Sequence, residues 1–196
     1  MQVKCSGVRV RTIMKSILLI LFLLPSIVIA EVHKEAKICK ESGQICFFWW
    51  PKLPEVKGWH QDMGHSYHYR MNTQAPDNYT FANAEAVIYA RAEYQEESSS
   101  DTLEEFISFS QSQFVSGAPS ELKVRKTGES FSKGKHKFLN YSFFPKGEGN
   151  WEQVSYAEDR DKDGNRYFII FVLSSRSKDG FEKNMGAYSE FIAQYQ

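Results

Sequence analysis

From about residue 67 onward, the chain carries apolar runs and alternating apolar and polar positions of the kind that strands require. Two runs, 84–92 and 168–173, are almost wholly apolar. Both are too short to cross a membrane and fit strands that are covered on both faces. Shorter or alternating runs predict further strands, and tight connections between them predict antiparallel pairing. These further strands are expected at 67–71, 122–126, 137–144 and 151–158.

Apolar residues at helical spacing predict two helices, at 102–115 and 180–194. Asp101 is expected as the N-cap of the first helix, with Glu104 three residues later in a capping-box arrangement, and Gly117 ends it. Each helix carries a single apolar stripe and should lie on a face of a sheet. The fold class predicted is α+β: an antiparallel sheet covered by helices, as an α/β/α sandwich.

A different pattern precedes these elements. Basic residues lead into the apolar run Ile17–Leu24, and a Pro-Ser break and small residues follow it up to Ala30. This layout predicts a secretory signal peptide over residues 1–30, cleaved after Ala30. The alternative, a transmembrane anchor, requires about 20 apolar residues, more than this run provides. Met14 offers an alternative start, because the leader that follows it is already complete.

Cleavage would leave residues 31–196 as a single exported domain, without a stable membrane anchor. We therefore expect a periplasmic or secreted protein. The whole chain has 24 basic and 24 acidic residues, and removing the four basic residues of the leader leaves a mildly acidic domain. This charge gives no reason to expect nucleic acid as a partner.

The order of the elements resembles a known family. The points of likeness are 81–92 leading into the capped helix, and 151–175 leading into the terminal helix. This order is similar to that of the PsbP-like fold, an α/β/α sandwich, and the segments Trp49-Trp50-Pro51 and Gly58-Trp59 look like those of small exported bacterial proteins of unknown function. The resemblance implies a binding or assembly accessory. It implies no shared catalytic residues and supplies no site residues.

Two cysteines, Cys39 and Cys46, remain once Cys5 leaves with the leader. In an exported chain a close, even-numbered pair predicts a disulfide. The alternatives are a redox pair or thiolate metal ligands. Redox pairs usually lie two residues apart, and the spacing here is not typical of zinc sites either.

Histidines supply the sharpest chemical hypothesis. His60, His65 and His68 place three of the five histidines within nine residues. Imidazole binds zinc and copper, so these three residues are candidate ligands for either metal. On a strand, however, His65 and His68 would point to opposite faces, because their separation is odd. A run of surface histidines is therefore the competing interpretation.

Carboxylates at Asp159, Asp161 and Asp163, followed by Gly164, resemble the start of a calcium loop. The position where such a loop needs a bidentate Glu holds Ile170. The flanking segments are predicted strands, and Asp-Gly is a frequent hairpin turn. A hairpin is therefore the favoured interpretation.

No nucleophile motif or phosphate-binding loop is present in the sequence. We therefore expect a non-catalytic protein that binds an unknown protein or small ligand, rather than an enzyme. The first alternative is a periplasmic transition-metal binder that uses the histidine cluster. The second is an unrecognised hydrolase.

Overall fold

The protein is described by a computed structural model that covers residues 32–39 and 43–196. The signal peptide predicted for residues 1–30 lies outside the described residues. None of the helices within this described part is both long and apolar enough to span a bilayer.

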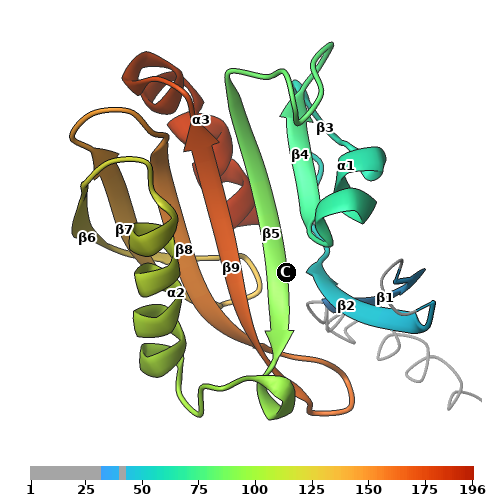
Figure 1. Cartoon of the computed structure of the whole chain (residues 1–196). Coiled ribbons are helices and arrows are strands. Elements are labelled where there is room, and N and C mark those ends of the chain that lie inside the picture. The colour runs from blue at the N-terminus through green and yellow to red at the C-terminus, as the bar shows by residue number, and fades with distance from the viewer. Residues whose placement is uncertain (1–31, 40–42) are drawn as a thin grey trace, which may run out of the picture.

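In the described residues, nine antiparallel strands form a single sheet, and three α-helices accompany it (Figure 1). The spatial order is β1-β2-β5-β9-β8-β7-β6, with β4 also paired to β5 and β3 paired to β4. In chain order the elements are β1 Val32–Ile38, β2 Ile45–Pro51, β3 Trp59–Gln61, α1 Met63–Tyr69, β4 Asn72–Pro76, β5 Ala86–Tyr94, a short 3₁₀ turn Gln95–Glu97, α2 Leu103–Gly117, β6 Leu122–Phe131, β7 Lys137–Pro145, β8 Trp151–Arg160, β9 Arg166–Ser175 and α3 Lys178–Gln194.

The two long helices lie on opposite faces of the sheet, as the predicted fold class requires. Phe106 and Ile107 of α2 pack against one apolar cluster, which includes Phe168 and Val172 of β9. Residues of α3 pack into the other cluster, with Phe171 of β9. In Figure 1, α2 lies in front of the sheet and α3 behind it. Because successive residues of a strand point to opposite faces, the apolar run 168–173 of β9 supplies both clusters.

The first long helix begins one residue later than the sequence predicted. Thr102 is its N-cap, and its side chain accepts the backbone N–H of Glu105 at 3.2 Å. The Glu105 carboxylate accepts the backbone N–H of Thr102 in return, which completes the capping box. Asp101 and Glu104 lie one position before the two residues that make it. The motif was therefore predicted, but with its register shifted by one.

The strand predicted at 67–71 is wrong, because most of that segment is the helix α1. Asp62 caps this helix: its Oδ1 accepts the backbone N–H of His65 at 3.1 Å. Burial by itself would raise the pKa of Asp62. Hydrogen bonds from the Phe81 N–H, the His65 N–H and the His65 ring outweigh it, and the pKa is lowered. A short helix thus forms where the apolar pattern resembled a strand.

The segment 159–165 forms the favoured hairpin between β8 and β9. The Asp161 carboxylate accepts hydrogen bonds from the backbone N–H groups of Asp163 and Asn165, both at 2.9 Å. The Asn165 side chain and the Tyr167 hydroxyl also donate to it. Donors within and beside the hairpin turn therefore already bind the Asp161 carboxylate, which a calcium ion would have needed as a ligand.

Candidate functional site: an aromatic cleft beside the first hairpin

A cleft of about 820 Å³ lies between the β1–β2 hairpin and the β3–β4 pair. We call it the aromatic cleft. Its volume lies within the range of known small-molecule sites, roughly 300–1,000 Å³. Its lining includes two tryptophans, two histidines and two buried amides, namely Trp50, Trp59, His33, His60, Asn72 and Gln74.

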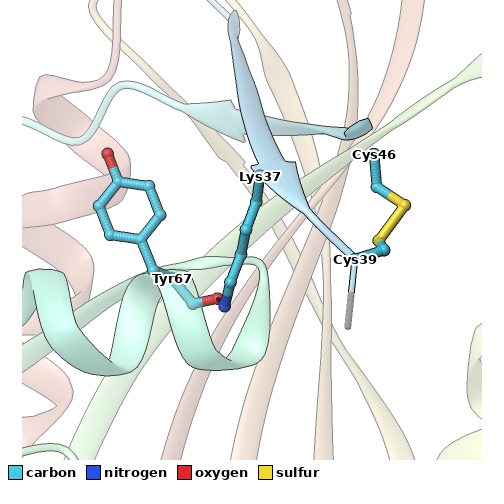
Figure 2. Close-up of a disulfide and its surroundings, with 4 residues drawn as sticks. All are labelled: Lys37, Cys39, Cys46 and Tyr67. Atoms are coloured by element: carbon cyan, nitrogen blue, oxygen red, sulfur yellow. Dashed lines mark hydrogen bonds between the residues drawn. A yellow bond between two sulfur atoms is a disulfide. The ribbon is translucent and has the colours of Figure 1, made fainter. Parts of the chain in front are cut away.

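The β1–β2 hairpin forms one wall and is fastened to α1. Lys37 of β1 donates a hydrogen bond from Nζ to the backbone oxygen of Tyr67 at 2.7 Å (Figure 2). The Tyr67 ring packs against Trp50 of β2, with the ring centres 5.2 Å apart. Trp50 is therefore held between its own strand and the helix, and only 4% of it is exposed.

A disulfide crosses the turn end of the same hairpin. The sulfur atoms of Cys39 and Cys46 lie 2.00 Å apart, so the structure brings together the two residues predicted to pair (Figure 2). Along the hairpin the register runs from Val32 opposite Pro51 to Ile38 opposite Ile45. Cys46 lies opposite Lys37 and Cys39 directly follows Ile38, so the cross-link joins the two strands at the turn end of the ladder and fixes this wall.

Two buried amides order the base of the cleft. Asn72 donates from Nδ2 to the backbone oxygen of Pro51 at 3.0 Å, which joins β4 to the end of β2. Gln74 in turn donates from Nε2 to Asn72 Oδ1 at 2.8 Å. Both residues are more than nine-tenths buried. This chain of bonds fixes the orientation of both amides in the cleft lining.

The Trp50 indole Nε1 is buried and has no hydrogen-bond partner among the described residues. An unsatisfied buried donor costs about 1–3 kcal/mol. The indole N–H can only donate, so a group that satisfies it must bring an acceptor atom. The surrounding walls enclose this nitrogen, so a ligand reaches it only if the neighbouring rings move.

Charges around the cleft balance. Lys52 and Lys57 contribute two positive charges, and Glu35 and Glu55 contribute two negative ones. The opposite wall carries Trp59, whose ring meets Phe191 of α3 edge to face at 6.0 Å. The cleft therefore combines apolar aromatic surface and fixed amides with no net charge from its lysines and glutamates.

The three predicted metal ligands do not form one site. His60 lies on β3 in the cleft lining, and its Nδ1 is 3.7 Å from the Asp77 carboxylate. His65 is turned to its own helix cap, with Nδ1 2.7 Å from Asp62 Oδ2. His68 lies edge to face with the Tyr69 ring at 4.7 Å. Within residues 32–39 and 43–196, no group of three or more His, Cys, Asp or Glu side chains is placed to hold a metal ion.

A chain of hydrogen bonds resembles a hydrolytic triad, but its serine and aspartate are buried and it joins structural elements. Ser132 Oγ lies 3.1 Å from His136 Nδ1, and His136 Nε2 lies 3.0 Å from Asp159 Oδ1. The Tyr195 hydroxyl donates to the other carboxylate oxygen at 2.7 Å. Ser132 and Asp159 are 8% and 4% exposed, so the hydroxyl cannot meet a substrate without local opening. The network ties the β6–β7 turn to the end of α3.

Sequence reasoning missed the amides and both tryptophans as site residues. Trp50 and Trp59 were visible as parts of aromatic segments, and they are the signal that could have pointed to this region. Asn72 and Gln74 carried no such signal, because β4 was not predicted. The site draws on β1, β2, β3, β4 and the loop 52–58, and only the tertiary structure brings these segments together.

Comparisons with known proteins give no family. No family model matches the chain, and no curated protein matches its sequence. Among solved structures, PA94 of Pseudomonas aeruginosa, a protein of unknown function, matches with 12% identity over 81% of this chain and 92% of its own, at a TM-score of 0.40. The Ran-binding protein Mog1p of Saccharomyces cerevisiae matches with 10% identity over 83% and 89% of the two chains, also at 0.40. A mutant of protein Mog1 matches with 11% identity over 84% and 90%, again at 0.40.

The resemblance to the PsbP-like family, drawn from the order of elements, is therefore corrected. The solved structures named above are Mog1 proteins and PA94, and no family model supports a PsbP-like assignment. Element order follows from apolar periodicity, which many unrelated sequences share, so it predicted the α+β architecture without predicting the family. Likenesses at this level say nothing of what the chain binds.

Proposed function

We propose that this is an exported, non-catalytic binding protein whose aromatic cleft receives an uncharged segment of a partner polypeptide. Export rests on the leader pattern of residues 1–30 and on the close cysteine pair of the hairpin. The observation that carries the binding role is the cleft itself, which combines two tryptophans with two oriented amides.

A polypeptide fits this lining better than a charged metabolite does. Tryptophan and methionine are enriched at protein interfaces, and Met63 joins the two tryptophans in the cleft lining. The amides suit the backbone N–H and C=O groups of a peptide, which both donate and accept. The balanced lysines and glutamates give no net attraction for an anion or a cation.

Peptide binding can be tested without knowing the partner. We suggest a library of N-acetylated, C-amidated hexapeptides of zero net charge, screened against the purified domain, with calorimetry for each binder. Trp59→Ala removes an aromatic wall, and Gln74→Ala removes a fixed amide. Each is expected to weaken a cleft-bound peptide about tenfold or more, the effect of losing one interface anchor.

Phe109→Ala is the matched control, because Phe109 lies on α2 and is 47% exposed. It should leave peptide affinity unchanged. Binders that the two cleft variants do not weaken, or a library without any binder, would contradict the proposal. The unfolding curve of each variant shows whether a lost affinity reflects the cleft or a destabilised fold.

A further inference from the structure

A second hollow lies on the face of the sheet that carries α2. It has a volume of about 320 Å³, and its lining includes three aromatic rings and two carboxylates. The five residues are Tyr69, Phe81, Tyr89, Glu85 and Glu152. We call it the cation groove. It shares no lining residue with the aromatic cleft.

The groove continues along α2 toward its C-terminal end. A neighbouring hollow of about 280 Å³ shares Asn150 and Glu152 with it and is lined further on by Phe114 of α2. Another, of about 270 Å³, shares Met71 and Tyr89 and also reaches Phe114. A ligand bound at the carboxylate therefore has apolar surface beside it for the rest of its body.

Strand register explains why Glu152 faces this groove. Glu152 of β8 lies opposite Ser174 of β9, and Ser174 lies opposite Val87 of β5. The next row on the same face lies two residues further along each strand. It consists of Val154, Val172 and Tyr89. Glu152 thus places a carboxyl group on an otherwise largely apolar face. In Figure 1, β5 and β9 run beside α2 on this face without a helix over them.

Glu152 lacks a cationic partner. Within the described chain no salt bridge reaches it, whereas Glu158 of the same strand is paired with Arg166. Burial raises the pKa of Glu152 to about 7, although a hydrogen bond from Ser174 opposes the rise. A nearby positive charge would favour the ionised form. The lining of the groove contains the Arg176 guanidinium, but no salt bridge joins it to Glu152 in the described part of the chain, so a ligand would have to supply the pairing charge.

The other charged groups of the groove are already engaged. Glu85 Oε1 accepts the hydroxyl of Ser177 at 2.5 Å. Arg176 donates from Nη2 to the backbone oxygen of Ala82 at 2.6 Å. Arg91 lines the neighbouring hollow rather than this one. The phenols that face the region are Tyr69 and Tyr89, and burial, followed by the charge of Glu152, raises the pKa of Tyr89 well above its ordinary value.

The aromatic rings form a continuous wall. Tyr69 and Phe81 have ring centres 5.5 Å apart, and Phe81 meets Tyr89 edge to face at 6.0 Å. The Phe81 backbone N–H is fixed by the Asp62 carboxylate at 2.9 Å, which holds the loop in place. Ring faces attract organic cations, and most strongly those shielded from water.

We infer that the cation groove binds an organic cation with a trimethylammonium-type headgroup, held by the Glu152 carboxylate and the rings of Tyr69, Phe81 and Tyr89. A soft, weakly hydrated ammonium loses little on leaving water, and it gains both the aromatic faces and the carboxylate. The site is independent of the peptide proposed for the aromatic cleft.

Choline and its neutral carbon isostere, 3,3-dimethylbutanol, are the probes. Calorimetry at pH 8 should show choline binding in the millimolar range and the alcohol binding at least tenfold more weakly. Lowering the pH to 6 should weaken choline about tenfold, because a carboxyl of pKa about 7 is then mostly protonated.

Two variants locate the site. Glu152→Gln keeps the shape of the side chain, and it should abolish the pH dependence and weaken choline about tenfold at pH 8. Tyr69→Leu, at a position 45% exposed, should weaken it about two- to fivefold. Glu104→Gln, on the exposed first turn of α2, should have no effect.

Equal affinity for choline and the neutral alcohol would overturn the inference. So would an unchanged affinity in Glu152→Gln, or no choline binding at about 10 mM in a folded wild-type protein. None of the four tryptophans lines this groove. Choline should therefore leave the tryptophan signals of the aromatic cleft unchanged, so failure of this inference is distinguishable from failure of the peptide proposal.

Discussion

The aromatic cleft and the cation groove are built from different parts of the same sheet. The cleft depends on the β1–β2 hairpin, which meets β5 in a single register pair, Trp49 with Ala92. The groove lies on β5, β8 and β9, and the central strand β9 pairs along its length with both β5 and β8. One site is therefore attached to the edge of the fold, whereas the other is part of its centre.

This difference has consequences for stability and plasticity. An element with few contacts to the core opens at low free energy, whereas the centre of a sheet opens only with global unfolding. We expect the aromatic cleft to adjust to its ligand, helped by the unsatisfied Trp50 nitrogen in its wall. The cation groove should instead be rigid, with an affinity set by charge and by pH.

Trp50→Ala should have the largest effect. It removes a side chain that is 4% exposed and packs against Phe48 and Tyr67, so we expect a loss of about 3–5 kcal/mol in the free energy of unfolding. Trp50→Phe keeps an aromatic ring and removes the five-membered ring that carries the unpartnered donor, so it should cost far less. Urea unfolding measures both variants. Equal losses would mean that the indole nitrogen is satisfied in solution.

The double variant Cys39→Ala/Cys46→Ala should lower the free energy of unfolding by about 2.5 kcal/mol on the chain-entropy model of a short loop. Its effect should also be local. Hydrogen exchange in β1 and β2 should rise, and peptide binding should weaken, while choline binding stays unchanged. Loss of both binding activities together would show that the hairpin supports the whole sheet. It would contradict the difference drawn between the aromatic cleft and the cation groove.

Glu152→Gln should alter how stability depends on pH. The pKa of Glu152 rises from 4.5 to about 7 in the folded protein. Its contribution to the free energy of unfolding is therefore fully present below pH 4.5 and is lost as the pH rises through 7. At pH 8 the glutamine variant should therefore be more stable than the wild type, by about 2 kcal/mol after allowing for partial exposure. Urea unfolding at pH 5 and pH 8 tests this, with Glu104→Gln as the control. Parallel pH curves for the wild type and Glu152→Gln would contradict the burial of this carboxyl.

Asp62→Ala should have the smallest effect, about 1 kcal/mol, because it removes the cap of α1. The lowered pKa of Asp62 means that its stabilisation is present above pH 3.8 and disappears as the pH falls through the folded-state pKa. The same carboxylate holds the loop at Phe81, so the variant should also weaken choline slightly. A variant with unchanged choline affinity would show that the loop keeps its place without this bond.

The sequence predicted the half of the fold that has strong periodicity. The strands from β5 to β9 and the helices α2 and α3 each carry a regular apolar pattern, and the structure places all of them near the predicted ranges. The first quarter was not predicted in the same way. Edge strand β1 is largely polar, and α1 is a short helix set by a cap rather than by a stripe.

The candidate sites were hidden for a different reason. Sequence reasoning selected histidines because of their residue type, but His65 is used by the cap of its own helix. The residues that do converge are a mixture of ordinary types. The importance of Glu152 depends on strand register, which places it on the α2 face opposite Ser174, and no local pattern contains that information.

The most direct test of the binding role uses the four tryptophans as reporters. Trp50 and Trp59 line the aromatic cleft, while Trp49 and Trp151 pack against the α3 side of the core. In 19F NMR of protein labelled with 5-fluorotryptophan, a neutral hexapeptide binder should shift the signals of Trp50 and Trp59 and leave those of Trp49 and Trp151 in place. Shifts confined to Trp49 or Trp151, or no shift at a saturating peptide concentration, would contradict the assignment of the cleft.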